Sequence, residues 1–205
     1  MKALWIDEGN DPDYAKAAAY GMTALFFSIR DPRVTQAYLI GVRSKGYTTG
    51  VYVAWNWAEY ESDTGFEFAQ KVSDRLGEIV PITSAQNFPK VQLNVELQDP
   101  LWIQNMATGW RKLRKYRDTS WNMAPFQGGW MSPNMVKEVT RCRIRVVPQL
   151  YLGNMTPAPE QAVIDNVVNA GFPRALVTPM YDAATRAVGQ AWDGFAFTQG
   201  RLPPV

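Results

Sequence analysis

The chain has 205 residues, of which 46% are hydrophobic and 20% charged, a composition typical of a globular protein rather than a disordered or fibrous one. A net charge of +2, from 21 basic and 19 acidic residues, gives no reason to expect a nucleic-acid partner. The sequence has no histidine and a single cysteine, Cys142, which excludes histidine-based catalysis, histidine-containing metal sites and an intramolecular disulfide.

Strand-like and helix-like segments alternate along the whole sequence. Strands are predicted over residues 3–7, 23–30, 47–57, 91–98, 120–127, 145–152, 175–181 and 194–198. Helices are predicted over residues 13–22, 34–45, 64–79, 100–116, 133–143 and 160–170. Ser132 is the expected N-cap of the fifth helix, with Pro133 at its first position.

This alternation predicts an α/β fold with a parallel sheet covered by helices. Eight strands are the number that closes a compact (β/α)8 TIM barrel, here as a single domain over residues 1–205. A doubly wound open sheet is the alternative architecture. Two features argue against it: residues 7–10 are Asp-Glu-Gly-Asn instead of a Gly-rich phosphate loop, and no shift in composition divides the chain.

The same sequence features predict where the protein is made and which groups it does not bind. Asp7 comes too early for the apolar core of a signal peptide, and no apolar run is long enough for a membrane span. We therefore expect synthesis in a cytoplasm. Without a phosphate loop or a cluster of metal ligands, no cofactor and no metal are predicted.

The predicted strand over residues 91–98 has one aliphatic and one polar face. Its polar residues are Gln92, Asn94, Glu96 and Gln98. Barrel interiors are normally filled by aliphatic side chains, so a polar inner face needs a hydrogen-bond network or a ligand. Glu96 lies toward the carboxyl end of the strand, where barrel enzymes place catalytic groups, and is a candidate general acid. The structural alternative is an ion pair with Arg30.

Acids, amides and aromatic rings gather at the carboxyl ends of the other predicted strands. Rings stack on pyranose faces, amides bind hydroxyls, and a carboxyl pair cleaves the glycosidic bond. The predicted catalytic residues are Glu96, Asp7 and Asp182. The predicted substrate-binding residues are Trp55, Trp57, Asn94, Gln127, Gln149, Tyr151 and Tyr181. The structural alternatives are a helix cap or an Arg30 ion pair for Asp7, a turn for Asp182, and core packing for the two tryptophans.

Two short segments resemble motifs of the small TIM-barrel muramidases of phages and bacteria. These segments are Trp5-Ile6-Asp7 and Asn94-Val95-Glu96. The family has Ile-Asp on its first strand and Asp-x-Glu at the end of its fourth, with the Glu as general acid. The resemblance implies that Glu96 is the general acid and that Asp7 is the strand-one acid. Asn94 stands where the family has a carboxylate.

Residues 4–10 and 51–57 are also similar to glycosidase-like barrels among the minor tail proteins of actinobacterial phages. This implies a virion component at the tail tip, made in the host cytoplasm, that binds host cell-envelope glycan and, if active, hydrolyses it. Other virion tail proteins would be its partners. The alternatives are a catalytically inactive structural adaptor of the tail, which Asn94 favours, and a free endolysin-like muramidase. Cytoplasmic sugar metabolism would require a phosphate or cofactor site, which the sequence lacks.

Overall fold

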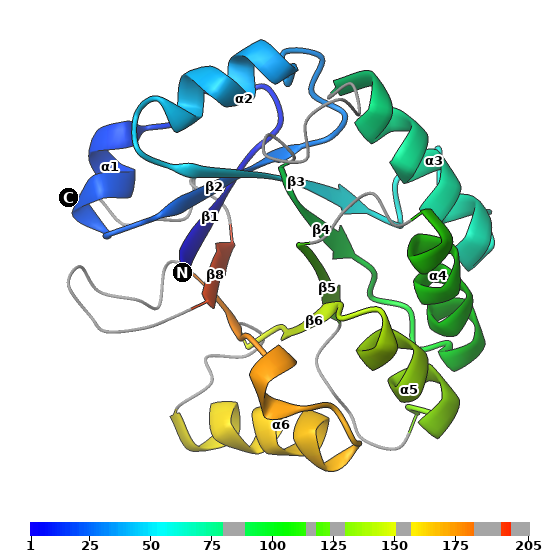
Figure 1. The fold of residues 1–205 in the computed structure, drawn as a ribbon. Coiled ribbons are helices and arrows are strands. Elements are labelled where there is room, and N and C mark those ends of the chain that lie inside the picture. The colour runs from blue at the N-terminus through cyan, green and yellow to red at the C-terminus, as the bar shows by residue number, and fades with distance from the viewer. Residues whose placement is uncertain (80–88, 114–117, 124–129, 151–156, 183–193, 198–205) are drawn as a thin grey trace.

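The computed structural model of the protein describes residues 1–79, 89–113, 118–123, 130–150, 157–182 and 194–197. For residues 157–160, 181–182 and 194–197 it describes the backbone alone. Within these ranges, strands and helices alternate along the chain, and the helices lie outside the sheet (Figure 1).

The strands are short and all run parallel. They are β1 (Lys2–Ile6), β2 (Ala24–Ser28), β3 (Thr48–Ala54), β4 (Lys90–Asn94), β5 (Thr119–Met123), β6 (Arg145–Pro148), β7 (Met180–Asp182) and β8 (Gly194–Phe197). The helices are α1 (Tyr14–Ala19), α2 (Gln36–Arg43), α3 (Gly65–Ile79), α4 (Pro100–Leu113), α5 (Pro133–Arg141) and α6 (Pro157–Asn169). Ser132 caps α5 through a hydrogen bond from Met135 N, with Pro133 in the first turn, as predicted.

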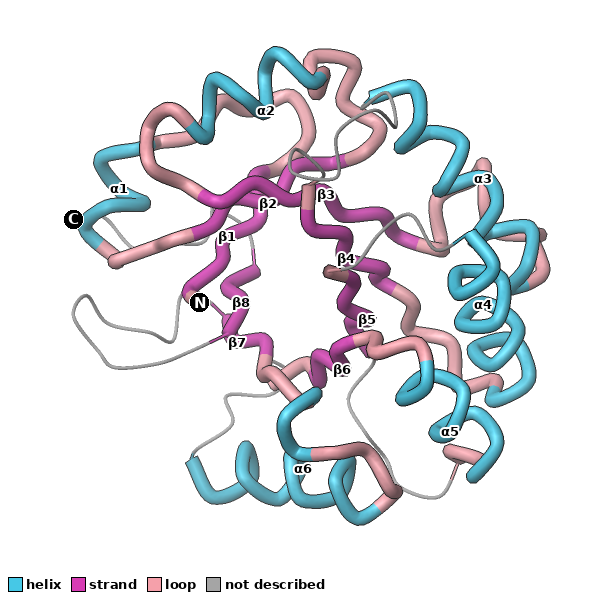
Figure 2. The backbone as a smooth tube through the Cα atoms, in the orientation of Figure 1, coloured by secondary structure: helices cyan, strands magenta, loops and turns pink. Residues whose placement is uncertain are grey.

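The sheet is curled, and its central part follows the order of the sequence. The full strand order is β6-β5-β4-β3-β2-β1-β8-β7. Strands β1 to β6 form a half-barrel of six parallel strands, and the short strands β8 and β7 continue beyond β1 (Figure 2). This arrangement brings the carboxyl ends of β1 to β6 to one end of the sheet.

The predicted closed (β/α)8 TIM barrel is wrong. Strands β6 and β7 stand at the two ends of the strand order. In the described part of the chain, isolated bridges take the place of a ladder between these edges, joining Val146 to Val177 and Gln149 to Met180. The reason lies in residues 175–181, which were expected to form one strand. A 3-10 helix over Arg174–Leu176 takes up its first part, so β7 keeps 3 residues.

The two faces of the sheet bury different kinds of side chain, because successive residues of a strand point to opposite sides. The outer face packs aliphatic side chains against the helices, including Leu4, Leu25, Val51, Val91 and Leu93. The inner face carries a smaller, more aromatic cluster, made of Ala3, Trp5, Ala24, Phe26, Tyr52, Val147 and Met180. Because both faces of the sheet are buried, the polar side chains of the inner face take their hydrogen-bond partners mainly from one another.

A glycine in β3 makes room for an aromatic ring on the inner face. A Cβ atom at Gly50 would lie 2.3 Å from Cε1 of Phe26, which projects from the neighbouring strand β2. Real Cβ contacts are longer than this, so the ring fills the space that any other residue at position 50 would occupy.

Helices α3 and α4 also approach each other at a glycine. A Cβ atom at Gly65 would lie 2.2 Å from the carbonyl oxygen of Trp102 and 2.6 Å from the backbone nitrogen of Met106. These are backbone atoms, so a side chain at position 65 would push the two helices apart.

No helix in the described part of the chain is both long and apolar enough to cross a lipid bilayer.

The close approach at Gly65 predicts a large difference between two glycines of the same helix. Gly65→Ala should lower the free energy of unfolding by about 2 kcal/mol, because overpacking against backbone cannot relax locally. Gly77→Ala is the matched control, since a Cβ there meets no atom within 4 Å. It should raise stability by roughly 0.5 to 1 kcal/mol, because alanine favours the helix. Urea unfolding of the three proteins measures both values, and equal effects would contradict the packing argument.

Candidate functional site

Strand β4 supplies the centre of the candidate site at the carboxyl end of the sheet. The predicted alternation is confirmed: Val91, Leu93 and Val95 belong to the cluster beneath the helices. Gln92 and Asn94 instead bond to residues of other strands across the inner face. The strand ends at Asn94, so Glu96 projects beyond the ladder and is exposed.

Three amide side chains and Glu96 form one hydrogen-bonded cluster, which we call the amide cluster; it consists of Asn94, Glu96, Asn122 and Gln149. Asn122 Nδ2 donates to Asn94 Oδ1 at 2.7 Å. Gln149 Nε2 donates to Glu96 Oε1 at 2.8 Å and approaches Asn94 Oδ1 at 3.4 Å. Asn122 and Gln149 are buried, whereas Glu96 is exposed. A solvent-facing carboxylate is therefore held in place by amides fixed inside the sheet.

The structure thus brings together three of the predicted site residues, Asn94, Glu96 and Gln149. Asn94 ends β4, Glu96 follows β4, and Gln149 follows β6. Strand β5 lies between β4 and β6 and pairs with both, which sets the distance between these residues. Asn122 of β5 completes the cluster and was not among the predicted residues. Its signal was present in the sequence, because Ser120 and Asn122 alternate with Trp121 as the polar residues of β4 do with its aliphatic ones.

Below the amide cluster, an aromatic pair fills the inner face. Trp5 of β1 stacks on Tyr52 of β3, with ring centroids 4.4 Å apart and planes within 4°. Trp5 Nε1 donates to Oε1 of Gln92, and the Tyr52 hydroxyl donates to the carbonyl oxygen of Ile6 at 3.2 Å. Burial raises the pKa of Tyr52 far above its usual value, and the charge of Asp7 adds to the effect. Tyr52 is therefore a neutral donor and not a general base.

Asp7, the second predicted catalytic residue, follows β1 and is half-buried. It directly follows Ile6, whose carbonyl oxygen accepts the hydrogen bond from the Tyr52 hydroxyl at 3.2 Å. In the strand order, β1 and β4 are separated by β2 and β3, so Asp7 and Glu96 follow different strands at the same carboxyl end of the sheet. Asp7 does not cap α1, because that role belongs to Asp13, whose Oδ1 accepts from Lys16 N.

Arg30, which follows β2, pairs with two other carboxylates at the carboxyl end of the sheet, instead of the ion pair with Glu96 that the sequence offered as an alternative. Its Nε lies 3.4 Å from Glu59 and 3.8 Å from Glu8. Its guanidinium carbon also lies 4.9 Å from the ring centroid of Trp57. Arg30, Glu8 and Glu59 thus form a charged cluster, which we call the rim, and the Arg30 guanidinium covers one face of the Trp57 ring.

The two predicted tryptophans have different positions. Trp55 packs against the aliphatic cluster beneath the helices. Trp57 contacts both the outer and the inner clusters, and its ring lies 6.2 Å from that of Tyr52. Trp57 is thus the tryptophan of this pair that connects the rim with the inner aromatic pair.

The remaining predicted site residues fall where the structure gives no side-chain positions. Gln127 and Tyr151 lie outside the described residues. Tyr181 and Asp182 belong to the backbone of β7, and their side chains are outside what is described. Their roles therefore stay predictions from the sequence.

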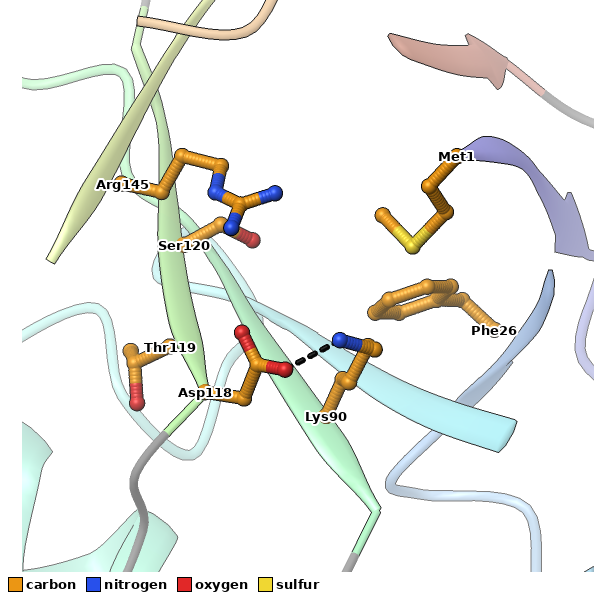
Figure 3. Close-up of a pocket in the computed structure, with 7 residues that line it drawn as sticks. All are labelled: Met1, Phe26, Lys90, Asp118, Thr119, Ser120 and Arg145. Carbon is orange, nitrogen blue, oxygen red and sulfur yellow. Dashed lines mark hydrogen bonds and ion pairs between the residues drawn. The ribbon is translucent and has the colours of Figure 1, made fainter. Parts of the chain in front are cut away.

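The opposite end of the sheet, where the strands begin, has a small cavity of about 10 Å³ (Figure 3). Its lining consists of Met1, Phe26, Lys90, Asp118, Thr119, Ser120 and Arg145. In this lining the Lys90 ammonium forms an ion pair with the Asp118 carboxylate. A volume of this size holds about one water molecule, so a sugar ring does not fit there. The candidate site is placed at the carboxyl end because the amide cluster and the exposed Glu96 carboxylate lie there.

A buried carboxylate ties together two loops near this site, and sequence reasoning missed it. Asp31, which follows β2, accepts hydrogen bonds from Gly9 N at 3.0 Å and from the Arg33 guanidinium at 2.7 Å. Arg33 also donates to the carbonyl oxygen of Asn10 at 3.0 Å. The loop after β1, which contains Glu8, is thereby fixed to the loop after β2. The hydrogen bonds from Arg33 hold the pKa of Asp31 well below its usual value.

No group of three or more Cys, Asp or Glu side chains that could hold a metal ion occurs within the described ranges. Comparison of the chain with protein-family models and with curated proteins finds no match in either set. The functional argument therefore rests on the residues and their geometry.

The Asp31 contacts predict a specific dependence of stability on pH. Because the pKa is lowered in the folded state, the ionised carboxylate stabilises the protein above its unfolded-state pKa near 4, and this contribution is lost as the pH falls below it. Asp31→Asn should cost roughly 2 kcal/mol at pH 7 and reduce the loss of stability on acidification. Asp74→Asn, on the exposed side of α3, is the matched control. Parallel pH dependences for wild type and Asp31→Asn would refute this role.

Proposed function

We propose that the chain binds a glycan at the carboxyl end of the sheet and cleaves a glycosidic bond, with Glu96 as the general acid. The observation that carries the proposal is the exposed Glu96 carboxylate, held by the 2.8 Å hydrogen bond from the buried Gln149. Glycoside cleavage requires carboxyl groups and no histidine or metal, which fits a chain without histidine.

The hydrogen bond from Gln149 also bears on where the acid carries its proton. Glu96 Oε1 accepts from Gln149 Nε2, so the protonated carboxyl group is favoured with its proton on Oε2. That oxygen would then protonate the leaving glycosidic oxygen. The amide cluster behind Glu96 limits rotation of the carboxyl group, which supports a fixed direction of proton transfer.

A second carboxylate is needed to activate water or to stabilise the oxocarbenium-like transition state, and Asp7 and Asp182 are the proposed candidates. Asp7 is half-buried and follows Ile6, the partner of the Tyr52 hydroxyl, at the carboxyl end of the sheet, where Glu96 also lies. The separation of the two carboxyl groups decides the stereochemical course, with about 5 Å for retention and roughly 6.5 to 9.5 Å for inversion. Trp57 at the rim and the predicted Tyr151 are the proposed contacts to sugar rings.

Glu96→Gln tests the proposed acid. The variant keeps the side chain's size and removes the proton that is transferred, so turnover of purified cell wall or of model glycans should fall at least 100-fold or so. Binding of the same glycans should change little. Glu61→Gln, another exposed glutamate, is the matched control and should keep full activity. Undiminished turnover by Glu96→Gln would remove Glu96 from the mechanism.

The second candidate function is glycan binding without catalysis, in an adaptor that has lost the reaction. Asn94 favours this function, because an amide stands beside Glu96 where the similar family has an acid. Asn94 Oδ1 accepts from both Asn122 and Gln149, so an aspartate at this position would keep both hydrogen bonds. Asn94→Asp is therefore compatible with the hydrogen bonds of the amide cluster.

Asn94→Asp separates the two functions. A carboxylate at position 94 would disfavour ionisation of Glu96 through like-charge repulsion and keep the acid protonated to higher pH. For an active enzyme we expect the pH limit of cleavage to move upward relative to wild type. Glycan binding by both proteins with no cleavage by either one would identify the adaptor. Thermal unfolding of the two proteins checks that the amide cluster tolerates the change.

We also propose that the chain acts as a minor component of a phage tail, at its tip, with other tail proteins as partners and host envelope glycan as ligand. The similarity of residues 4–10 and 51–57 to minor tail proteins supports this proposal. An antibody against the chain should then label purified phage particles. Detection in the cell lysate but not in particles would favour a free endolysin-like muramidase instead.

A further inference from the structure

Two buried amide side chains on the inner face each have one atom without a hydrogen-bond partner among the described residues. They are Nε2 of Gln92 and Oδ1 of Asn122. Both side chains are 0% exposed. Buried amide atoms nearly always have a partner, so each of these atoms requires an explanation.

The orientation of the Asn122 amide follows from Glu96. A carboxylate can only accept, so Gln149 must face Glu96 Oε1 with its Nε2 atom. The same Nε2 also faces Asn94, which therefore presents its oxygen. Asn94 Oδ1 in turn requires a donor from Asn122, and Nδ2 supplies it at 2.7 Å. The atom left over on Asn122 is an acceptor, Oδ1.

The orientation of the Gln92 amide follows from Trp5 in the same way. An indole nitrogen can only donate, so Gln92 must face Trp5 with its Oε1 atom. The atom left over on Gln92 is a donor, Nε2. A leftover donor and a leftover acceptor thus occur together, and neither amide can be flipped without breaking the bond that orients it.

The two leftover atoms come from neighbouring strands. Asn122 of β5 pairs in register with Asn94, which is the next inward-facing residue after Gln92 on β4. A strand spacing of about 4.8 Å and a two-residue rise of about 6.6 Å place the two Cα atoms roughly 8 Å apart. A water molecule with ordinary hydrogen bonds bridges polar atoms up to about 6 Å apart, and amide side chains are long enough to shorten the interval between these two Cα atoms to that span.

We infer that the inner face binds one buried water molecule between Gln92 and Asn122. This water accepts a hydrogen bond from Gln92 Nε2 and donates one to Asn122 Oδ1. It joins two hydrogen-bond chains, one beginning at Trp5 and the other leading through Asn94 and Gln149 to Glu96. The site takes water because water supplies a donor and an acceptor in the volume of one atom. The inference does not depend on catalysis by Glu96.

Nuclear magnetic resonance on the wild-type protein without ligand tests the site directly. With nitrogen-15 in the glutamine and asparagine side chains, the Gln92 Nε2 protons should show cross-relaxation to a water that exchanges slowly with bulk solvent. Gln98, which is exposed, is the control and should show contact with fast water alone. A Gln92 amide without slow water, or one bonded directly to Asn122, would overturn the inference.

A double-mutant cycle gives an independent measurement. Gln92→Met and Asn122→Leu should each raise the unfolding equilibrium constant by about tenfold, because each leaves the shared water poorly bound. In the double variant, the unfolding equilibrium constant should rise by clearly less than the product of the two single-variant factors, because the water is lost only once. Gln98→Met should leave the constant unchanged. Fully additive effects would contradict a shared water, and the resonance measurement on wild type decides the matter if a variant does not fold.

Discussion

The inner face of β4 carries amides in a parallel sheet that is buried on both sides, where aliphatic residues are the rule. Each buried amide needs both a donor and an acceptor as neighbours, and side chains of other strands on the inner face supply some of these partners. Gln92 bonds to Trp5 of β1, and Asn94 bonds to Asn122 of β5. The exposed Glu96 carboxylate is positioned by these inner amides, because Gln149 bonds both to Glu96 and to Asn94.

Much of the fold follows from the pattern of the sequence, because the pleat and the helical period both leave a periodic signal. The order of strands and helices and the alternation along residues 91–98 were predictable for this reason. Whether the sheet closes into a barrel was not predictable from the same pattern. Counting β/α units does not reveal how many residues each strand contributes to a ladder, and the 3-10 helix at Arg174–Leu176 left too few for β7 to pair fully on both edges.

The candidate site was predictable where it depends on strand parity and less so where it depends on loops. Asn94, Glu96 and Gln149 meet because they have the same strand parity at the ends of β4 and β6, which lie on either side of β5. The partners of Arg30 were not predictable, because Glu8 and Glu59 lie in loops whose paths no periodicity describes. The same limit applies to the loop contacts of Asp31, which depend on backbone donors that are invisible in a sequence.

The contact between Gly50 and Phe26 has a consequence for how this sequence can vary. The ring lies where a side chain at position 50 would be, so the two positions share a single volume on the inner face. A larger residue at position 50 is compatible with the fold only when position 26 becomes smaller, and a smaller residue at 26 alone leaves a hole. Natural or engineered variants should therefore change positions 26 and 50 together, although the two positions lie on different strands, β2 and β3.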